Sequence, residues 1–148
     1  MKQTISLEEL IPNPKSLRLL ILHTPFPLVL DPLKDCTNLI KLDVSSNSLE
    51  KLPHLGHLSY LRFMFLHNNK LDLDNLKIAF SQGPNIPVTV RSPLSKSIVW
   101  VTFWGNKNSF YARHFLANNT SAIAIDKNIV VEEERSEKMY QMVSPFSP

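Results

Sequence analysis

The sequence predicts an α/β fold in which short parallel strands line a concave face, irregular or helical segments form the convex side, and a cap closes the C-terminal end. Two observations lead to this prediction. The chain has 148 residues and 22 leucines, of which 20 lie between Leu7 and Leu76. Apolar residues recur in that stretch at a fixed interval, which is typical of structural repeats that stack side by side.

Three segments of the chain align without gaps, and their first positions lie 22 residues apart. They begin at Leu17, Leu39 and Leu61 and carry apolar residues at their first, fourth and sixth positions. The second and third segments also carry an asparagine at the ninth position, Asn47 and Asn69. This is the pattern of a leucine-rich repeat, in which a short strand turns alternate side chains into the core and the asparagine satisfies backbone groups in the following turn. The sequence therefore predicts a leucine-rich repeat solenoid.

The repeats divide the chain into parts, within a predicted leucine-rich repeat domain that covers residues 1–135. The predicted repeats lie near residues 17–38, 39–60, 61–85 and 98–108. Helix-like spacing at Leu73, Leu76 and Phe80 accounts for a longer convex side in the third repeat. Residues 86–97 are an insertion, for which both an extra hairpin strand and a protruding loop remain open.

The last part of the domain, residues 109–135, is predicted to cap the repeats, because the end of a repeat stack leaves an open core. A helix from about Ser109 to Asn118 and a short strand near residues 122–125 would shield the fourth repeat. Residues 136–148 are predicted to form a flexible tail.

Two groups of residues resemble known families. One group resembles the C-terminal cap of the cytosolic, SDS22-like or dynein-light-chain-like class of leucine-rich repeat proteins. Its members are Asn106, Tyr111, Arg113, Ile125, Asp126 and residues 131–135. The runs at residues 35–43 and 66–69 are similar to the leucine-rich-repeat-and-IQ-domain family. This resemblance implies a protein-interaction scaffold, often in cilia or flagella, but the sequence has no IQ motif and calmodulin binding is not implied.

Composition and patterning narrow the class of protein. A single cysteine, Cys36, excludes an internal disulfide and a cysteine-built zinc site, and its place in a leucine column predicts a buried apolar role. No apolar run approaches the ~18 residues of a membrane-spanning helix, and the first residues lack the apolar core of a signal peptide. We therefore expect a cytoplasmic location without a membrane partner, with the cilium or cytoskeleton as one setting and the nucleus left open.

No group of residues predicts an enzyme, a metal site or a cofactor site. His54 and His57 are expected on the convex side and His67 on the other face, so they would not converge on one metal ion. Asp72 and Asp74 follow a strand, as the residues of a turn and a helix start do. The sequence thus predicts no catalytic residue, no metal ligand, no cofactor and no small-molecule substrate.

Side chains between the strand leucines are expected to point outward onto the concave face. These outward positions become aromatic toward the C-terminal half, and large exposed aromatics mark interaction surfaces. The residues predicted to bind a partner protein are Arg62, Phe63, Phe65, His67, Trp100 and Trp104. The alternative is that the insertion or the tail folds over this face and covers it.

The function predicted from these features is that of a non-enzymatic protein-interaction module or scaffold that binds through the concave face. One alternative is a regulatory subunit of a phosphatase or a dynein motor. Another is an accessory protein of an RNA particle, because Arg18, Lys41 and Arg62 form a diagonal of positive charge. Three cations are too few for strong binding to phosphates, and the net charge of +3 is mild, so a nucleic acid partner is not favoured.

Overall fold

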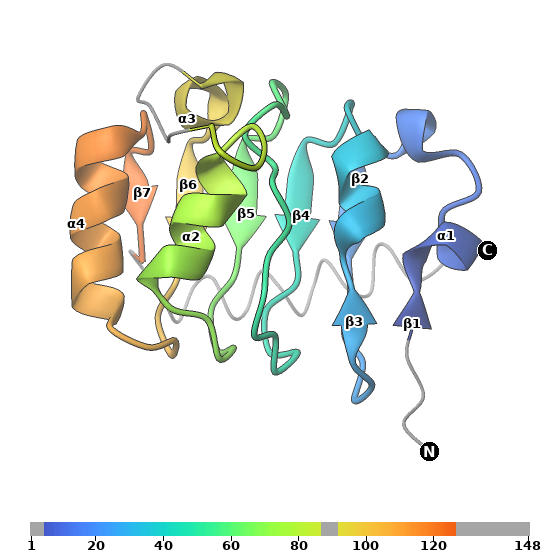
Figure 1. The fold of residues 1–148 in the computed structure, drawn as a ribbon, viewed down its shortest axis with the longest axis horizontal. Helices are drawn as coiled ribbons and strands as arrows, with labels where there is room; N and C mark the ends of the chain where they lie inside the picture. The colour runs from blue at the N-terminus through green and yellow to red at the C-terminus, as the bar shows by residue number, and fades with distance from the viewer. Residues whose placement is uncertain (1–4, 87–91, 127–148) are drawn as a thin grey trace.

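Five parallel strands form one open sheet in the computed structural model, which describes residues 5–86 and 92–126 (Figure 1). The strands follow one another across the sheet in chain order: β2 (Leu19–Ile21), β4 (Lys41–Asp43), β5 (Phe63–Phe65), β6 (Trp100–Thr102) and β7 (Ala124–Ile125). A separate parallel pair joins β1 (Ile5–Ser6) to β3 (Leu28–Val29). The described residues also form four α-helices, α1 (Leu7–Leu10), α2 (Leu73–Phe80), α3 (Pro93–Ser97) and α4 (Ser109–Asn119). The fold is therefore mixed α/β, and none of its described helices is long and apolar enough to cross a membrane.

The 22-residue spacing of the sequence repeats is the pairing register of the first three strands of the sheet. Leu19 pairs with Lys41, and Lys41 pairs with Phe63. The next step is longer because residues 86–97 intervene, so Phe63 pairs with Trp100. The alternate residues point into the core and form the buried column Leu20, Leu42, Met64 and Val101. A shift of one residue in any strand would turn this column outward, so burial of the leucines specifies the register.

Asparagine side chains hold the turns that follow the strands, as predicted for Asn47 and Asn69. Asn69 Nδ2 donates to the carbonyl oxygens of Leu66, in its own turn, and of Val44, in the preceding repeat. Asn69 Oδ1 accepts from two backbone N–H groups of the preceding repeat, including that of Asn47. Asn106 makes the same kind of bonds in the following turn, one of them to the Leu66 carbonyl. These side chains pair backbone groups that no strand ladder reaches.

Helix α2 forms the longer convex segment predicted for the third repeat. It begins with a capping box, in which the Asp72 carboxylate accepts from the Asn75 backbone N–H and the Asn75 side chain accepts from the Asp72 N–H. Leu76 and Phe80 lie on its inner face and are fully buried in the core. Asp72 is thus the residue of a helix start, as its position after the strand predicted.

Helix α3 corrects the prediction for the insertion, since residues 93–97 form neither a strand nor a loop. The Ser92 side chain accepts from the Ser95 backbone N–H, and Pro93 occupies the first helical position. A serine cap followed by proline favours the start of a helix, and Leu94 is buried in the core. Residues 87–91, where the alternation suggested a strand, lie outside the described residues.

Helix α4 and strand β7 follow β6 at the end of the sheet, where the sequence predicted a helix from about Ser109 to Asn118 and a short strand near residues 122–125. Ala112 and Leu116 of α4 are fully buried, and β7 pairs in parallel with β6. The carboxylate of Asp126 then accepts from the backbone N–H groups of Phe103 and Trp104, in the turn after β6. The rest of the predicted cap and the predicted tail lie outside the described residues.

Candidate interaction surface

The pairing register arranges the outward side chains of the sheet in rows that run from strand to strand. One row is Leu19, Lys41, Phe63, Trp100 and Ala124. The next row is Ile21, Asp43, Phe65 and Thr102. We call the surface made by these rows, with His67 and Trp104 beyond them, the sheet face. Every second residue of a strand points to the same side of the sheet. The pairing register places these residues next to one another in adjacent strands, which gives the continuous rows.

Five of the six residues predicted to bind a partner belong to the sheet face, and Arg62 lies at its border, directly before β5. Arg62 is exposed, whereas Phe63, Trp100 and Trp104 are half-buried. Phe65 and His67 are buried, at 1% and 4% exposed, so the expectation of an exposed aromatic surface is wrong at these two positions.

Neighbouring rings account for much of the packing around Phe65 and His67. The Phe65 ring packs edge-on against Trp100, with 5.2 Å between ring centroids, and Lys41 Nζ lies 4.7 Å from the Phe65 centroid. The His67 ring stacks on Trp104 with 4.6 Å between centroids, and its Nδ1 lies 2.7 Å from the Thr102 hydroxyl. These contacts make Phe65 and His67 structural members of the face, because each is held by rings or hydrogen bonds from an adjacent strand or turn.

Asp43 is a polar residue of the sheet face that the sequence analysis did not single out. It is fully buried, and its Oδ1 accepts from the Ser45 backbone N–H at 3.0 Å and from the Ser45 hydroxyl at 2.6 Å. Its Oδ2 is buried and has no hydrogen-bond partner in the described structure. A buried carboxylate oxygen without a hydrogen-bond partner lowers the stability of the fold. The sequence signal was an acidic residue at an outward strand position between Ile21 and Phe65.

Positive charge lies at the start of the strands. The Ile40 backbone N–H donates to the Arg18 carbonyl, and the Arg62 N–H donates to the Ile40 carbonyl, so the two arginines flank Ile40 across three strands. Both arginines are exposed, and Lys41, which follows Ile40, is the first residue of β4. Arg18 and Arg62 therefore border the sheet face on one side, and Lys41 belongs to its first row.

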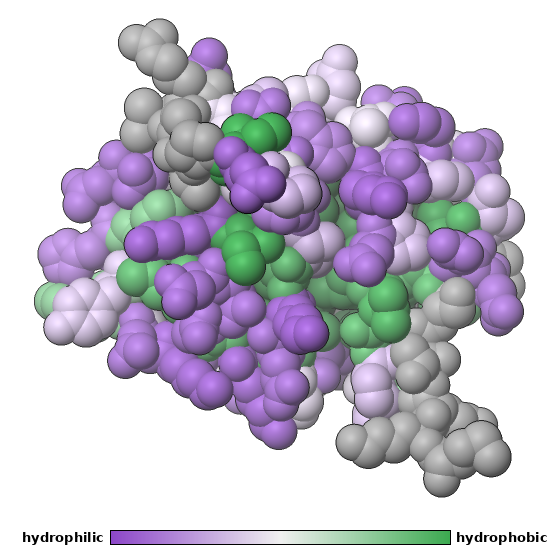
Figure 2. Space-filling view, in the orientation of Figure 1, coloured by the Kyte–Doolittle hydropathy of each residue, from purple (hydrophilic) through white to green (hydrophobic). Residues whose placement is uncertain are grey.

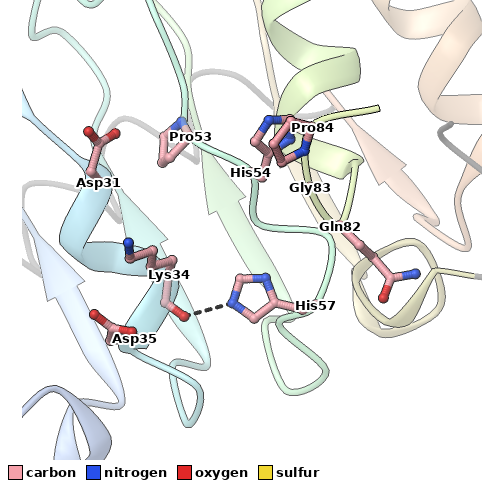
Figure 3. Close-up of a pocket in the computed structure, with 9 residues that line it drawn as sticks. All are labelled: Asp31, Lys34, Asp35, Pro53, His54, His57, Gln82, Gly83 and Pro84. Atoms are coloured by element: carbon pink, nitrogen blue, oxygen red, sulfur yellow. Dashed lines mark hydrogen bonds between the residues drawn. The ribbon is translucent and has the colours of Figure 1, made fainter. Parts of the chain in front are cut away.

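A cleft of about 540 Å³ lies among the loops on the other side of the core (Figure 3). It is lined by the 3-10 helix Asp31–Asp35, by His54 and His57, and by residues 82–84. The His57 ring Nε2 lies 2.7 Å from the Lys34 carbonyl oxygen, which orients the imidazole. His67 belongs to the sheet face, and no three histidine, cysteine or acidic side chains converge on a metal-sized site within residues 5–86 and 92–126. Figure 2 shows this side of the molecule as mostly hydrophilic, with apolar side chains confined to small patches.

Comparison with known proteins finds a distant relative. The chain is 28% identical over 123 residues to human leucine-rich repeat and IQ domain-containing protein 3. The match covers 80% of this chain but only 18% of the relative, so the chain spans less than a fifth of the length of that protein. No protein-family model matches the chain. No solved structure matches it. The similarity supports a loose relationship to leucine-rich repeat proteins and suggests a protein-interaction role.

Proposed function

We propose that the chain is a leucine-rich repeat solenoid that has no enzymatic activity and binds another protein on its sheet face. The observation that carries this proposal is the alignment of five parallel strands, which presents continuous rows of outward side chains. Solenoids use such repeated strands as extended binding surfaces. The distant leucine-rich repeat relative supports the same class of function.

The chemistry of the sheet face favours a partner segment with an apolar anchor and acidic neighbours. Phe63, Trp100 and Trp104 supply aromatic surface, and Arg62 supplies an exposed guanidinium beside them. Aromatic residues and arginine are the types that contribute most to binding at protein interfaces. An amphipathic helix or extended segment with carboxylates could meet both features.

The setting of this interaction is part of the proposal. The resemblance to scaffold proteins favours the cytoplasm and a ciliary or cytoskeletal assembly. A regulatory subunit of a phosphatase or a dynein motor would use the same surface. An RNA particle is the second candidate, because Lys41 on the face and Arg18 and Arg62 at its border are positively charged.

Site-specific photo-crosslinking in cells tests the proposal. A photoreactive residue at position 62 is expected to form a discrete adduct with one protein, whereas the same residue at exposed position 96, on α3, is not. With that protein purified, Arg62→Glu should weaken binding by about tenfold or more, and Lys96→Glu should leave it within about twofold. Both variants should keep the wild-type melting temperature, since both side chains are exposed.

Two outcomes would contradict the proposal. Identical adducts from positions 62 and 96 would show that the sheet face does not select a partner. Adducts with RNA, together with a steep loss of binding as salt concentration rises, would favour the RNA-particle function instead.

A further inference from the structure

Helix α4 has an inner face that packs and an outer face that does not. Ala112 and Leu116 are buried, and the half-buried Phe115 meets Phe80 of α2 edge-on with 6.2 Å between ring centroids. In contrast, the side chains of Phe110 and Tyr111 are 59% and 62% exposed. The helix stands at the end of the row of strands in Figure 1, so no further repeat among the described residues covers its outer face.

The exposed aromatic side chains of α4 form a cluster. The Phe110 ring lies edge-on to Tyr111, with 5.6 Å between centroids, and edge-on to the His114 ring, with 4.7 Å between centroids. A hollow of about 190 Å³ lies beside them, lined by Phe110, Arg113, His114 and Ala117. Exposed apolar surface of this kind has a cost in an isolated domain and marks sites of interaction. We call Phe110, Tyr111, Arg113 and His114 the α4 patch.

The charges around the α4 patch indicate the charge of the partner that it would bind. None of the eleven residues of α4 is acidic, and Arg113 lies within the patch. The N-cap residue Asn108 makes no side-chain cap hydrogen bond, and Lys107 precedes it. The uncapped first turn, which contains Phe110, keeps the positive end of the helix dipole. These features favour a negatively charged group against the patch.

We propose that the α4 patch is a second docking surface, which binds an acidic segment of another protein through an apolar side chain that enters the hollow. The aromatic rings bury the apolar side chain, and Arg113 and the helix N-terminus meet the flanking carboxylates. Phenylalanine, tyrosine and arginine are enriched at such interfaces. The patch shares no residue with the sheet face, so substitutions can test each surface separately.

Two labelled hexapeptides serve as probes in a fluorescence anisotropy titration of the whole chain. One has the sequence Glu-Glu-Leu-Phe-Glu-Glu, and in the other lysine replaces each glutamate. The acidic peptide is expected to bind at least tenfold more tightly than the basic one. The double substitution Phe110→Ser with Tyr111→Ser should weaken binding of the acidic peptide at least tenfold. Tyr60→Ser is the matched control, because Tyr60 is 61% exposed at a different site, and it should leave binding unchanged.

Charge reversal separates the α4 patch from the sheet face. Arg113→Glu should weaken binding of the acidic peptide by at least tenfold, whereas Arg62→Glu should have no effect. If Arg62→Glu alone abolishes binding, the peptide occupies the sheet face, and the α4 proposal fails while the proposed function stands. If neither peptide binds the wild-type chain, the α4 proposal also fails.

Other occupants of the α4 patch would give different results. Self-association of the wild-type chain in sedimentation that is lost in the Phe110 and Tyr111 double variant would assign the patch to a second copy. Peptide binding that occurs only after removal of residues 127–148 would assign it to the chain's own C-terminal segment. Either result would overturn the proposal of a separate acidic partner.

Discussion

Single asparagine side chains connect neighbouring repeats of this protein. Asn69 contacts three carbonyl oxygens and two backbone N–H groups, in its own turn and in the preceding repeat. It is 7% exposed, so water has little access to the groups it pairs. A side chain amide suits this role because it donates and accepts at the same time.

Replacing Asn69 with alanine is therefore expected to destabilise the fold by about 2–4 kcal/mol, since buried donors and acceptors lose their partners. Urea unfolding measures the loss. Asn68→Gly is the control, because Asn68 is exposed and its φ of 58° is one that glycine adopts without strain. A control variant as unstable as Asn69→Ala would contradict the assignment of the turn bonds to Asn69.

Cys36 shows how burial changes the chemistry of a side chain. It is fully buried in the core, as its leucine column predicted. Burial raises the pKa of the Cys36 thiol, and the nearby Asp35 carboxylate raises it further, against a smaller opposite effect of Lys15. The folded state therefore holds the neutral thiol, which is the unreactive form.

This pKa shift predicts a dependence of stability on alkaline pH. The unfolded chain loses its thiol proton near the ordinary pKa of 9.0, while the folded chain retains it. The contribution of the thiol is thus complete below about pH 9 and declines as the pH rises further. In urea unfolding, the stability difference between wild type and Cys36→Ala should decrease from pH 8 to pH 10. A difference that grows over this range would show that the thiol is not held neutral.

At the scale of elements, the loop of the second repeat is joined to the ends of α2 and α3 at Gly56. The Gly56 N–H donates to the Ser81 carbonyl at 2.9 Å, and its carbonyl accepts from the Leu94 N–H at 2.9 Å. A Cβ at position 56 would lie 2.5 Å from the Phe80 carbonyl oxygen, closer than atoms approach. The atoms nearest to this added Cβ are backbone atoms of Phe80 and Ser81, which cannot move aside as the end of a flexible side chain can.

Gly56→Ala is expected to destabilise the protein by about 2 kcal/mol or more, because the loop must move away from α2. Gly83→Ala is the matched control. Its added Cβ would meet only the end of the Ile86 side chain, at 3.4 Å, and should cost less than about 1 kcal/mol. Thermal unfolding of the two variants measures the difference, and equal melting temperatures would argue against close packing at Gly56.

Across the whole molecule, the sheet and the asparagine bonds join every described repeat to the next. Each strand from β4 to β6 pairs on both sides, and the core column crosses all of them. A substitution that destabilises one repeat should therefore lower the stability of the others, as in a repeat array with strong coupling between neighbours. Both tryptophans, Trp100 and Trp104, lie in the fourth repeat and report on its unfolding.

Leu42→Ala tests this coupling from a distant strand. Leu42 of β4 is fully buried, so its truncation should cost about 2–5 kcal/mol. The midpoint of urea unfolding should fall equally by tryptophan fluorescence and by far-UV circular dichroism. Leu10→Ala, at a leucine 45% exposed, should change either midpoint little. A fluorescence midpoint that stays constant in Leu42→Ala would mean that the repeats unfold separately.

The repeat period predicts much of this molecule without coordinates. The spacing of Leu17, Leu39 and Leu61 predicts strands β2, β4 and β5 and their pairing, because residues one period apart meet in adjacent strands. The turn asparagines follow from the same spacing, since each turn needs a group that pairs its backbone. The cap helix and β7 were also expected, because the end of the stack must be shielded.

Tertiary packing determines the features that the period does not predict. The period gives the position of a residue in its repeat, but it does not say which side chains from other segments pack against that residue. Residues 86–97 have no period, so the sequence left open a segment in which the Ser92 cap and burial of Leu94 select a helix. On the sheet face, the period predicts that Phe65 and Asp43 point outward. Their enclosure depends on Trp100, Lys41 and other side chains that only the folded chain brings beside them.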